Sequence, residues 1–199
     1  MAAAPQDKGK SIAWVSIVAT LATTVLAISS LITVYVTVTA WREEREAARP
    51  YLTVQESPRV TVGERVSFEL KFTNSGLHPA ANLSSKSLVF AQDLAHEPVH
   101  HDEFDLANEI PNNTVSSLVI DLDRREHATA AAPPVYIVVD LQYDDPILNK
   151  GFNQTIYLKW NGVTKGETQP IAHVQVTEKN KILNYFKNQH IDPSARQTI

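Results

Sequence analysis

The stretch from Ser11 to Trp41 contains no Asp, Glu, Lys, Arg, His, Pro or Gly, and it is bounded by Lys10 and Arg42. A helix needs roughly 20 mainly apolar residues to cross the hydrocarbon core of a bilayer, and this stretch exceeds that length. It is also about twice as long as the apolar region of a cleaved signal peptide. The sequence therefore predicts a transmembrane helix over residues 11–41, after a short polar tail over residues 1–10, with the lipid bilayer as partner.

Basic residues flank this predicted span almost equally. Lys8 and Lys10 precede it, and Arg42, Arg45 and Arg49 follow it. Cytoplasmic flanks of membrane helices carry an excess of Lys and Arg. The protein is therefore expected to be a single-pass membrane protein, with the side of its C-terminal part undetermined and a slight lean to the cytoplasm.

One face of the predicted span is rich in small and hydroxyl side chains. It consists of Ser16, Thr20, Thr23, Ala27, Ser30, Val34 and Thr37. Small residues let two helices approach closely, and hydroxyl groups can bond across the contact. This face is a candidate interface for a homo-oligomer or a partner helix. The alternative is that the hydroxyl groups only bond to carbonyls of their own helix.

The charged residues 42–50 are predicted to continue the helix into water as a juxtamembrane helix, until Pro50 ends it. Beyond it the pattern changes to alternation, since Val66, Phe68, Leu70 and Phe72 share one face of a strand. Further strands are predicted at residues 51–54, 80–90, 114–122, 135–143, 152–160 and 171–176, with a hairpin turn at residues 144–151. About seven strands favour an immunoglobulin-like antiparallel β-sandwich over residues 51–177.

Residues 178–199 are predicted to form a short C-terminal helix and tail. The helical period runs from Glu178 to Ile191, with Thr177 as the expected N-cap. The apolar face of this helix is expected to pack on the sandwich. Binding to the membrane surface or to a partner are the alternatives.

Composition excludes several classes of function. The net charge is −4 and no block of basic residues lies beyond the membrane flank, so nucleic acid is not an expected partner. The chain has no cysteine, which excludes disulfides and thiolate chemistry. It also contains no nucleophile elbow and no glycine-rich phosphate loop, so neither a catalytic residue nor a cofactor is predicted.

The segment from His96 to Glu103 is the one stretch that suggests metal chemistry. His96, His100 and His101 are candidate zinc ligands, although their spacing matches no established zinc motif. The alternative is an ordinary polar loop. Tyr143, near the end of a predicted central strand, is expected to be a packed core tyrosine, with a tyrosine corner as the alternative. The Asp residues at positions 140, 144 and 145 are expected to form a turn.

Two short motifs carry a resemblance. They are Ala-Arg-Pro-Tyr-Leu at residues 48–52 and Asn-Ser-Gly-Leu-His-Pro-Ala at residues 74–80. Together with the charged juxtamembrane helix, they resemble a group of uncharacterised bacterial membrane-anchored proteins, in which one span is followed by an immunoglobulin-like domain. The resemblance implies this architecture and no enzyme activity or ligand.

Two functions follow as expectations. The first is a membrane-anchored, non-enzymatic accessory or scaffold protein that presents its sandwich to a protein partner. The second is a metal- or ligand-binding sensor or enzyme built on the segment from His96 to Glu103. The sequence favours the first, because it offers many strand edges and loops but no catalytic set.

Overall fold

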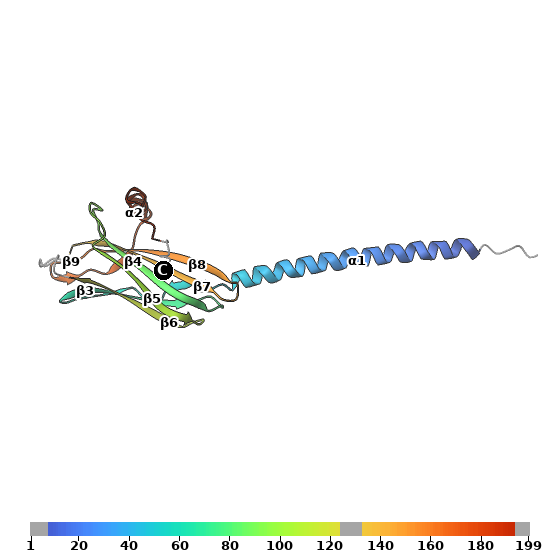
Figure 1. The fold of residues 1–199 in the computed structure, drawn as a ribbon, viewed down its shortest axis with the longest axis horizontal. Coiled ribbons are helices and arrows are strands. Elements are labelled where there is room, and N and C mark those ends of the chain that lie inside the picture. Colours follow the sequence, from blue (N-terminus) through green and yellow to red (C-terminus); the bar gives the residue numbers. More distant parts are fainter. Residues whose placement is uncertain (1–7, 124–132, 194–199) are drawn as a thin grey trace, which may run out of the picture. The chain divides into compact units, whose positions relative to one another are not determined.

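The structure is a computed structural model that describes residues 8–123 and 133–193. The chain divides into two units, residues 1–47 and residues 48–199, and each is described by itself. The described part of the first unit is helix α1, Lys8–Ala47 (Figure 1). An 18-residue window within its section Trp14–Ala47 has a mean hydropathy of 2.1, so by length and composition this helix could cross a membrane. The helix passes without a break through the charged residues that follow Trp41 and ends at Ala47.

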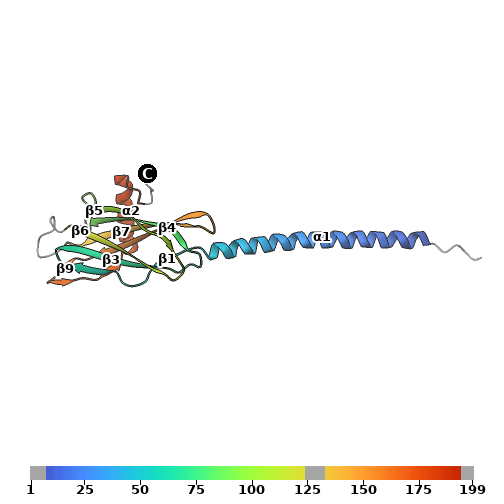
Figure 2. The same ribbon diagram turned by 60° about the horizontal axis from the view of Figure 1, so that its bottom comes forward.

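The second unit begins with a small antiparallel sheet, here the first sheet. Its strands are β1 (Leu52–Val54), β2 (Arg59–Val62), β3 (Arg65–Asn74) and β6 (Val115–Asp123). β3 is central, because β6 pairs along one edge of it while β1 and β2 share the other edge. Figure 2 brings this sheet forward. The alternation predicted for β3 is confirmed, since Val66, Phe68, Leu70 and Phe72 are all buried.

The second sheet is larger and also antiparallel. Its strands are β4 (Ala80–Ala91), β5 (His100–Ile110), β7 (Val135–Asp145), β8 (Lys150–Trp160) and β11 (Ile171–His173). They lie in the order β11-β8-β7-β4-β5, and β9 (Val163–Thr164) pairs with β10 (Glu167–Thr168) in a separate hairpin. β7 is central and buried over nearly its whole length, as its continuous apolar run predicts.

Side chains from both sheets form one buried core. Phe68 of the first sheet meets Trp160 of the second edge to face, with ring centroids 5.3 Å apart. Full burial of a large apolar side chain stabilises a fold by roughly 1.5–3 kcal/mol, so this shared core holds the two sheets together. An apolar N-terminal helix, antiparallel sheets and a short C-terminal helix are thus confirmed.

The C-terminal helix α2, Val176–Gln189, covers the opposite face of the second sheet. In Figure 1 it lies on the side of β4 and β8 that faces away from β3 and β6. Ile182, Tyr185 and Phe186 are buried there, with Tyr185 and Phe186 against Phe90 at centroid distances of 5.3 and 5.5 Å. The expectation that this helix packs on the sheets is confirmed.

The N-cap prediction for α2 was wrong. Gln175, and not Thr177, occupies this position, and the side chain of Glu178 accepts the backbone N–H of Gln175 at 2.7 Å. The predicted last strand is also shorter than expected. It ends at His173, because the capping box on Gln175 starts the helix at Val176.

Candidate functional site

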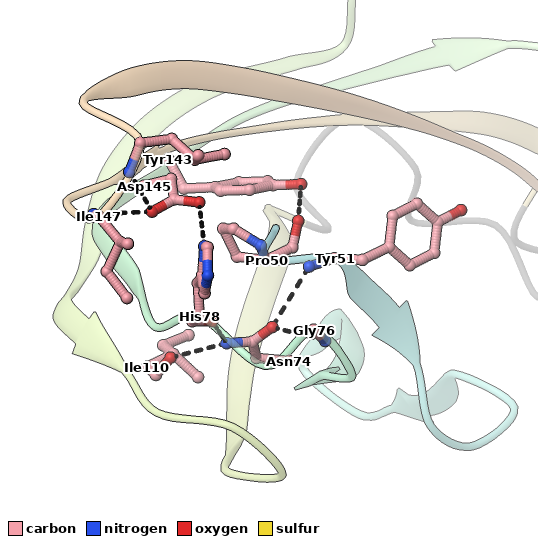
Figure 3. A network of polar contacts seen from close by, with 10 residues as sticks. Pro50, Tyr51, Asn74, Gly76, His78, Ile110, Tyr143, Asp145 and Ile147 are labelled. Carbon is pink, nitrogen blue, oxygen red and sulfur yellow. Dashed lines mark hydrogen bonds and ion pairs between the residues drawn. The ribbon is translucent and has the colours of Figure 1, made fainter. Parts of the chain in front are cut away.

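A cluster of buried, hydrogen-bonded polar side chains surrounds the segment that follows α1. We call residues 48–52 the junction segment. It is held by the turn between β3 and β4 and by the end of β7 (Figure 3). The two motifs of the sequence that carried the family resemblance, residues 48–52 and 74–80, therefore contact each other directly.

Asn74, the last residue of β3, is fully buried and makes four side-chain hydrogen bonds. Its Oδ1 accepts the backbone N–H of Tyr51 at 3.2 Å and of Gly76 at 3.0 Å. Its Nδ2 donates to the carbonyls of His78 at 2.8 Å and Ile110 at 3.0 Å. An asparagine amide offers two donor hydrogens and two acceptor lone pairs, so this side chain is saturated. It ties three separate stretches of backbone together.

Gly76 lets the junction segment pass directly over the turn. A Cβ atom at this position would lie 2.1 Å from the carbonyl oxygen of Arg49 and 2.6 Å from the Cα of Pro50. Both are backbone atoms, so no side-chain rotation could relieve the clash. The glycine is therefore required by close approach of two backbones.

His78 and Asp145 form a buried pair beside this crossing. The Nδ1 of His78 lies 2.7 Å from an oxygen of Asp145, and the backbone N–H of His78 donates to the carbonyl of Ala48 at 2.9 Å. The other oxygen of Asp145 accepts the N–H groups of Ile147 and Leu148. Burial alone would raise the pKa of Asp145, but the hydrogen bonds from His78, Leu148 and Ile147 hold it below its ordinary value.

Tyr143 and Phe152 complete the contacts to the junction segment. The hydroxyl of Tyr143 donates to the carbonyl of Pro50 at 3.4 Å, and its ring stacks on Phe152. The guanidinium carbon of Arg49 lies 5.5 Å from the centre of the Phe152 ring. Tyr143 is a packed core tyrosine, as predicted, and burial raises the pKa of its hydroxyl. Its hydroxyl bonds to backbone, as in the tyrosine-corner alternative, but the carbonyl belongs to a residue 93 positions away and not to one a few residues upstream.

These contacts form what we call the junction clamp: Asn74, Gly76, His78, Tyr143 and Asp145 around residues 48–52. Backbone groups of Ala48, Pro50 and Tyr51 are each bonded to it. The Asn74 amide and the Asp145 carboxylate form these hydrogen bonds with other groups of the same domain. The clamp is therefore suited to holding the backbone of the junction segment in place.

The expected turn role of the three aspartates holds for one of them. Asp145 caps the turn that follows β7. Asp140 lies fully buried within β7, where it accepts hydrogen bonds from the Thr155 hydroxyl at 2.6 Å and from the Gln142 amide at 3.1 Å. Asp140 therefore lies in a strand, and not in a turn as predicted.

The candidate zinc ligands do not converge in this structure. His100 and His101 are the first two residues of β5 and were expected in a loop. Successive strand residues point to opposite faces, so His100 follows its partner Val89 towards the core and His101 follows Leu88 towards α2. His96 lies outside the strand and offers its carbonyl to Tyr185. Among the described residues, no group of three His, Asp or Glu side chains could hold a metal ion.

His100 is in a partly buried position. Burial lowers the pKa of its imidazole, while the charge of Asp102, 3.5 Å away, raises it, and the net effect is a decrease. The neutral ring is therefore favoured, as expected for a histidine that faces the core.

The residues of the candidate helix interface all lie on α1. The hydroxyls of Thr20, Thr23 and Thr37 each donate to the carbonyl four residues earlier, at 2.8–2.9 Å. Ser16, Ala27 and Ser30 lie on the same exposed face. The donor hydrogen of each threonine is thus used within the helix, and only its lone pairs remain for a partner. The interface stays a prediction.

Three solved structures show a distant likeness to this chain. β-Glucosidase 3B from Thermotoga neapolitana, solved with α-D-glucose, is 10% identical over 63% of this chain and 17% of that one, with a TM-score of 0.30. DesR, a β-glucosidase from Streptomyces venezuelae, is 16% identical over 63% and 15%, with a TM-score of 0.28. β-Glucuronidase 2 from Bacteroides uniformis is 9% identical over 54% and 12%, also with 0.28. The chain thus spans less than a fifth of each of these proteins.

The comparison with curated proteins finds no match to this sequence. Residues 12–164 match the family described as a domain of unknown function, DUF8453. The match includes most of α1, the whole junction clamp and both sheets as far as β8. The chain therefore belongs to the DUF8453 family.

Proposed function

We propose that this protein is a membrane-anchored, non-enzymatic accessory or scaffold protein that presents its β domain to a protein partner close to the bilayer. The junction clamp carries this proposal. It holds the backbone of the β domain from Ala48 onward, and α1 extends to Ala47, the residue immediately before it. A protein that only needed tethering could use a loose linker, whereas this one has a buried cluster at the junction.

The length of the connection supports the same proposal. Trp41 is the last residue of the uncharged stretch, and the chain remains helical from there to Ala47. At 1.5 Å per residue this is roughly 10 Å of helix. The domain would therefore stay near the headgroups and meet partners in or at the same membrane.

Three finer features belong to the proposal. Two antiparallel sheets around one core are compatible with an immunoglobulin-like sandwich, the architecture expected from the sequence. The small-residue face of α1 would add a lateral contact to a partner helix or to a second copy. The slight excess of basic residues after the span favours a cytoplasmic domain, which protease digestion of intact cells and of opened membranes would test.

The alternative of a metal-binding sensor or enzyme has no specific observation in its favour. β5 places His100 and His101 on opposite faces of the sheet, and so separates the ligands on which that alternative depended.

The proposal can be tested by photo-crosslinking in native membranes. A photoreactive amino acid would replace Phe104, Val119 or Leu183, which are exposed apolar side chains on β5, β6 and α2. We expect discrete adducts with a membrane-associated protein. A flexible ten-residue Gly/Ser insertion between Ala47 and Ala48 should reduce them. The same insertion after Gly63, which lies in the open turn between β2 and β3, is the control and should not.

Absence of adducts from all three positions, with the domain folded, would contradict the proposed function. Equal adduct yields from the two insertions would contradict the importance of the fixed junction.

A further inference from the structure

Two strand edges end unpaired beside each other in the β domain. β8 pairs with β7 along its whole length, but β11 covers only Leu158 to Trp160 of its other edge. β1 pairs with β3 along one edge. Among the described residues, no strand pairs with the other edge of β1, or with the outer edge of β8 on the N-terminal side of Tyr157.

The direction of the free backbone groups follows from the pairing. The N–H of Val174 donates to the carbonyl of Tyr157 at 3.3 Å, so the backbone groups of Tyr157 point away from β7. The register of β7 and β8 is continuous, and in an antiparallel pair this direction alternates along the strand. Asn153 and Thr155 therefore direct their backbone N–H and C=O groups outward, where an additional strand would bind.

β1 presents a matching edge. The N–H of Gln55 donates to the carbonyl of Lys71, so Gln55 and Thr53 point to β3 while Leu52 and Val54 point away from it. The outward carbonyl of Leu52 accepts a hydrogen bond from the side-chain amide of Gln154 at 2.6 Å. The Gln154 side chain thus makes a hydrogen bond to β1 that a neighbouring strand would otherwise make. The Oε1 of Gln154 is buried and has no hydrogen-bond partner among the described residues.

A cleft of about 490 Å³ lies between these two edges. Its walls are formed by β1 with the preceding Tyr51, by residues 154–157 of β8, by His173 and Val174, and by Lys179 of α2. Lys179 carries the one fixed charge among the lining side chains, and its Nζ lies 4.8 Å from the centre of the Tyr157 ring. The cleft therefore has a positive rim and an apolar interior that includes Ile156 and Val54.

We propose that this cleft binds an extended acidic segment of a partner protein, which adds as a strand to the outer edge of β8. Main-chain hydrogen bonds to Asn153 and Thr155 would supply the affinity, and alternate side chains the specificity. The side chain level with Ile156 would face the core and be apolar. Its neighbours in the segment would face Tyr157 and Lys179, and there a carboxylate complements the lysine.

This inference deepens the proposed function and depends on it, because the segment belongs to the protein partner. The binding site is the cleft between β1 and β8, which the junction clamp leaves accessible. Tyr51 and Leu52 join the two regions, since both belong to the junction segment and both line the cleft. The partner segment would thus bind directly beside the junction segment.

Disulfide trapping can detect such a segment even when its affinity is low. The chain has no cysteine, so His173→Cys would place one thiol on the rim of the cleft in the full-length protein in lipid nanodiscs. Ala172→Cys is the matched control, because Ala172 is also exposed but does not line the cleft. The probes are a cysteine-bearing peptide with alternating Glu and Val, its Lys and Val counterpart, and a backbone N-methylated form of the acidic peptide.

We expect His173→Cys to capture the acidic peptide at least about fivefold more than the basic or the N-methylated peptide, under equal reducing conditions. Reversing the charge with Lys179→Glu should remove most of this preference, whereas Lys181→Glu, an exposed position on α2 outside the cleft, should leave it unchanged. Ala172→Cys should show no preference among the three peptides.

Equal capture of the three peptides by His173→Cys would overturn the inference. So would a disulfide-linked dimer of the His173→Cys protein that excludes the peptides, because the occupant would then be a second copy. The proposed function fails separately, when no crosslink forms from the exposed positions on β5, β6 and α2.

Discussion

Replacing Asn74 with alanine tests the junction clamp at its most connected residue. The change removes four hydrogen bonds from a fully buried side chain and leaves the N–H groups of Tyr51 and Gly76 and the carbonyls of His78 and Ile110 without their partner. A buried polar group that loses its partner costs about 1–3 kcal/mol. Taking the low end for four groups gives a loss of about 4 kcal/mol in the free energy of unfolding.

Asn112→Ala is the matched control for this variant. Asn112 lies near the same turn. Its side-chain amide donates to the carbonyl of Gly76, and its Oδ1 accepts from the exposed Nδ2 of Asn113, which water can replace, so its loss should cost about 1 kcal/mol. With a urea dependence of about 2 kcal/mol per M, the midpoint should fall by about 2 M for Asn74→Ala and by about 0.5 M for the control.

Urea unfolding of the full-length protein in detergent micelles provides the assay. Of the three tryptophans, Trp160 is buried in the core and Trp14 and Trp41 lie exposed on α1. Changing the two helix tryptophans to phenylalanine makes Trp160 fluorescence a reporter of the β domain alone. If Asn74→Ala shifts the midpoint no further than Asn112→Ala, the reasoning about a four-bond clamp is refuted.

Three other changes give expected outcomes. Gly76→Ala places a Cβ against the backbone of Arg49 and should destabilise the domain by about 2–4 kcal/mol in the same assay, whereas Gly63→Ala, with open space around it, should be close to neutral. The pKa of Asp145 is below its ordinary value of 3.8, so the ionised carboxylate stabilises the domain at pH values above 3.8, and this stabilisation is lost as the pH falls through the folded-state pKa. The Asp145→Asn variant should therefore lose less stability between pH 5 and pH 2 than the unchanged protein, as measured by urea midpoints at each pH. Phe186→Ala removes a buried ring from the contact with Phe90 and should cost about 3–5 kcal/mol, with faster amide hydrogen exchange throughout α2 than in β7.

The parts of the fold that were predictable are those in which the pattern is local. The apolar stretch of α1 and the alternation of β3 are visible within single segments, because each buries its own apolar side chains in a fixed period. The buried run of β7 is likewise continuous. These features place the core without knowledge of which strands pair.

β5 was missed for a physical reason. It lies at the edge of the second sheet and carries Asp102, Glu103, Asp105 and Glu109, so it has little of the alternation expected of a strand. Charged side chains on an edge strand oppose pairing with other chains, and they also hide the strand from sequence patterns. The histidines at its start were consequently assigned to a loop and considered together as ligands.

The junction clamp could not be derived from the sequence for a different reason. Its members come from separate segments, and the pairing of Asn74 with Tyr51 or of His78 with Asp145 depends on the folded topology. The sequence showed that residues 48–52 lead into the first strand and that residues 74–80 form a turn. Their contact is specified only when β1 pairs with the end of β3.

Amide hydrogen exchange of the junction segment in the full-length protein, in lipid nanodiscs, tests the account most directly. The N–H of Tyr51 bonds to Asn74, and the N–H of His78 bonds to the carbonyl of Ala48. If the junction clamp holds residues 48–52 to the β domain, both amides should exchange only with global unfolding, at the rate of amides in β7. Exchange of these two amides at the rate of an exposed loop, while β7 stays protected, would show that residues 48–52 are not held by the clamp and contradict the account.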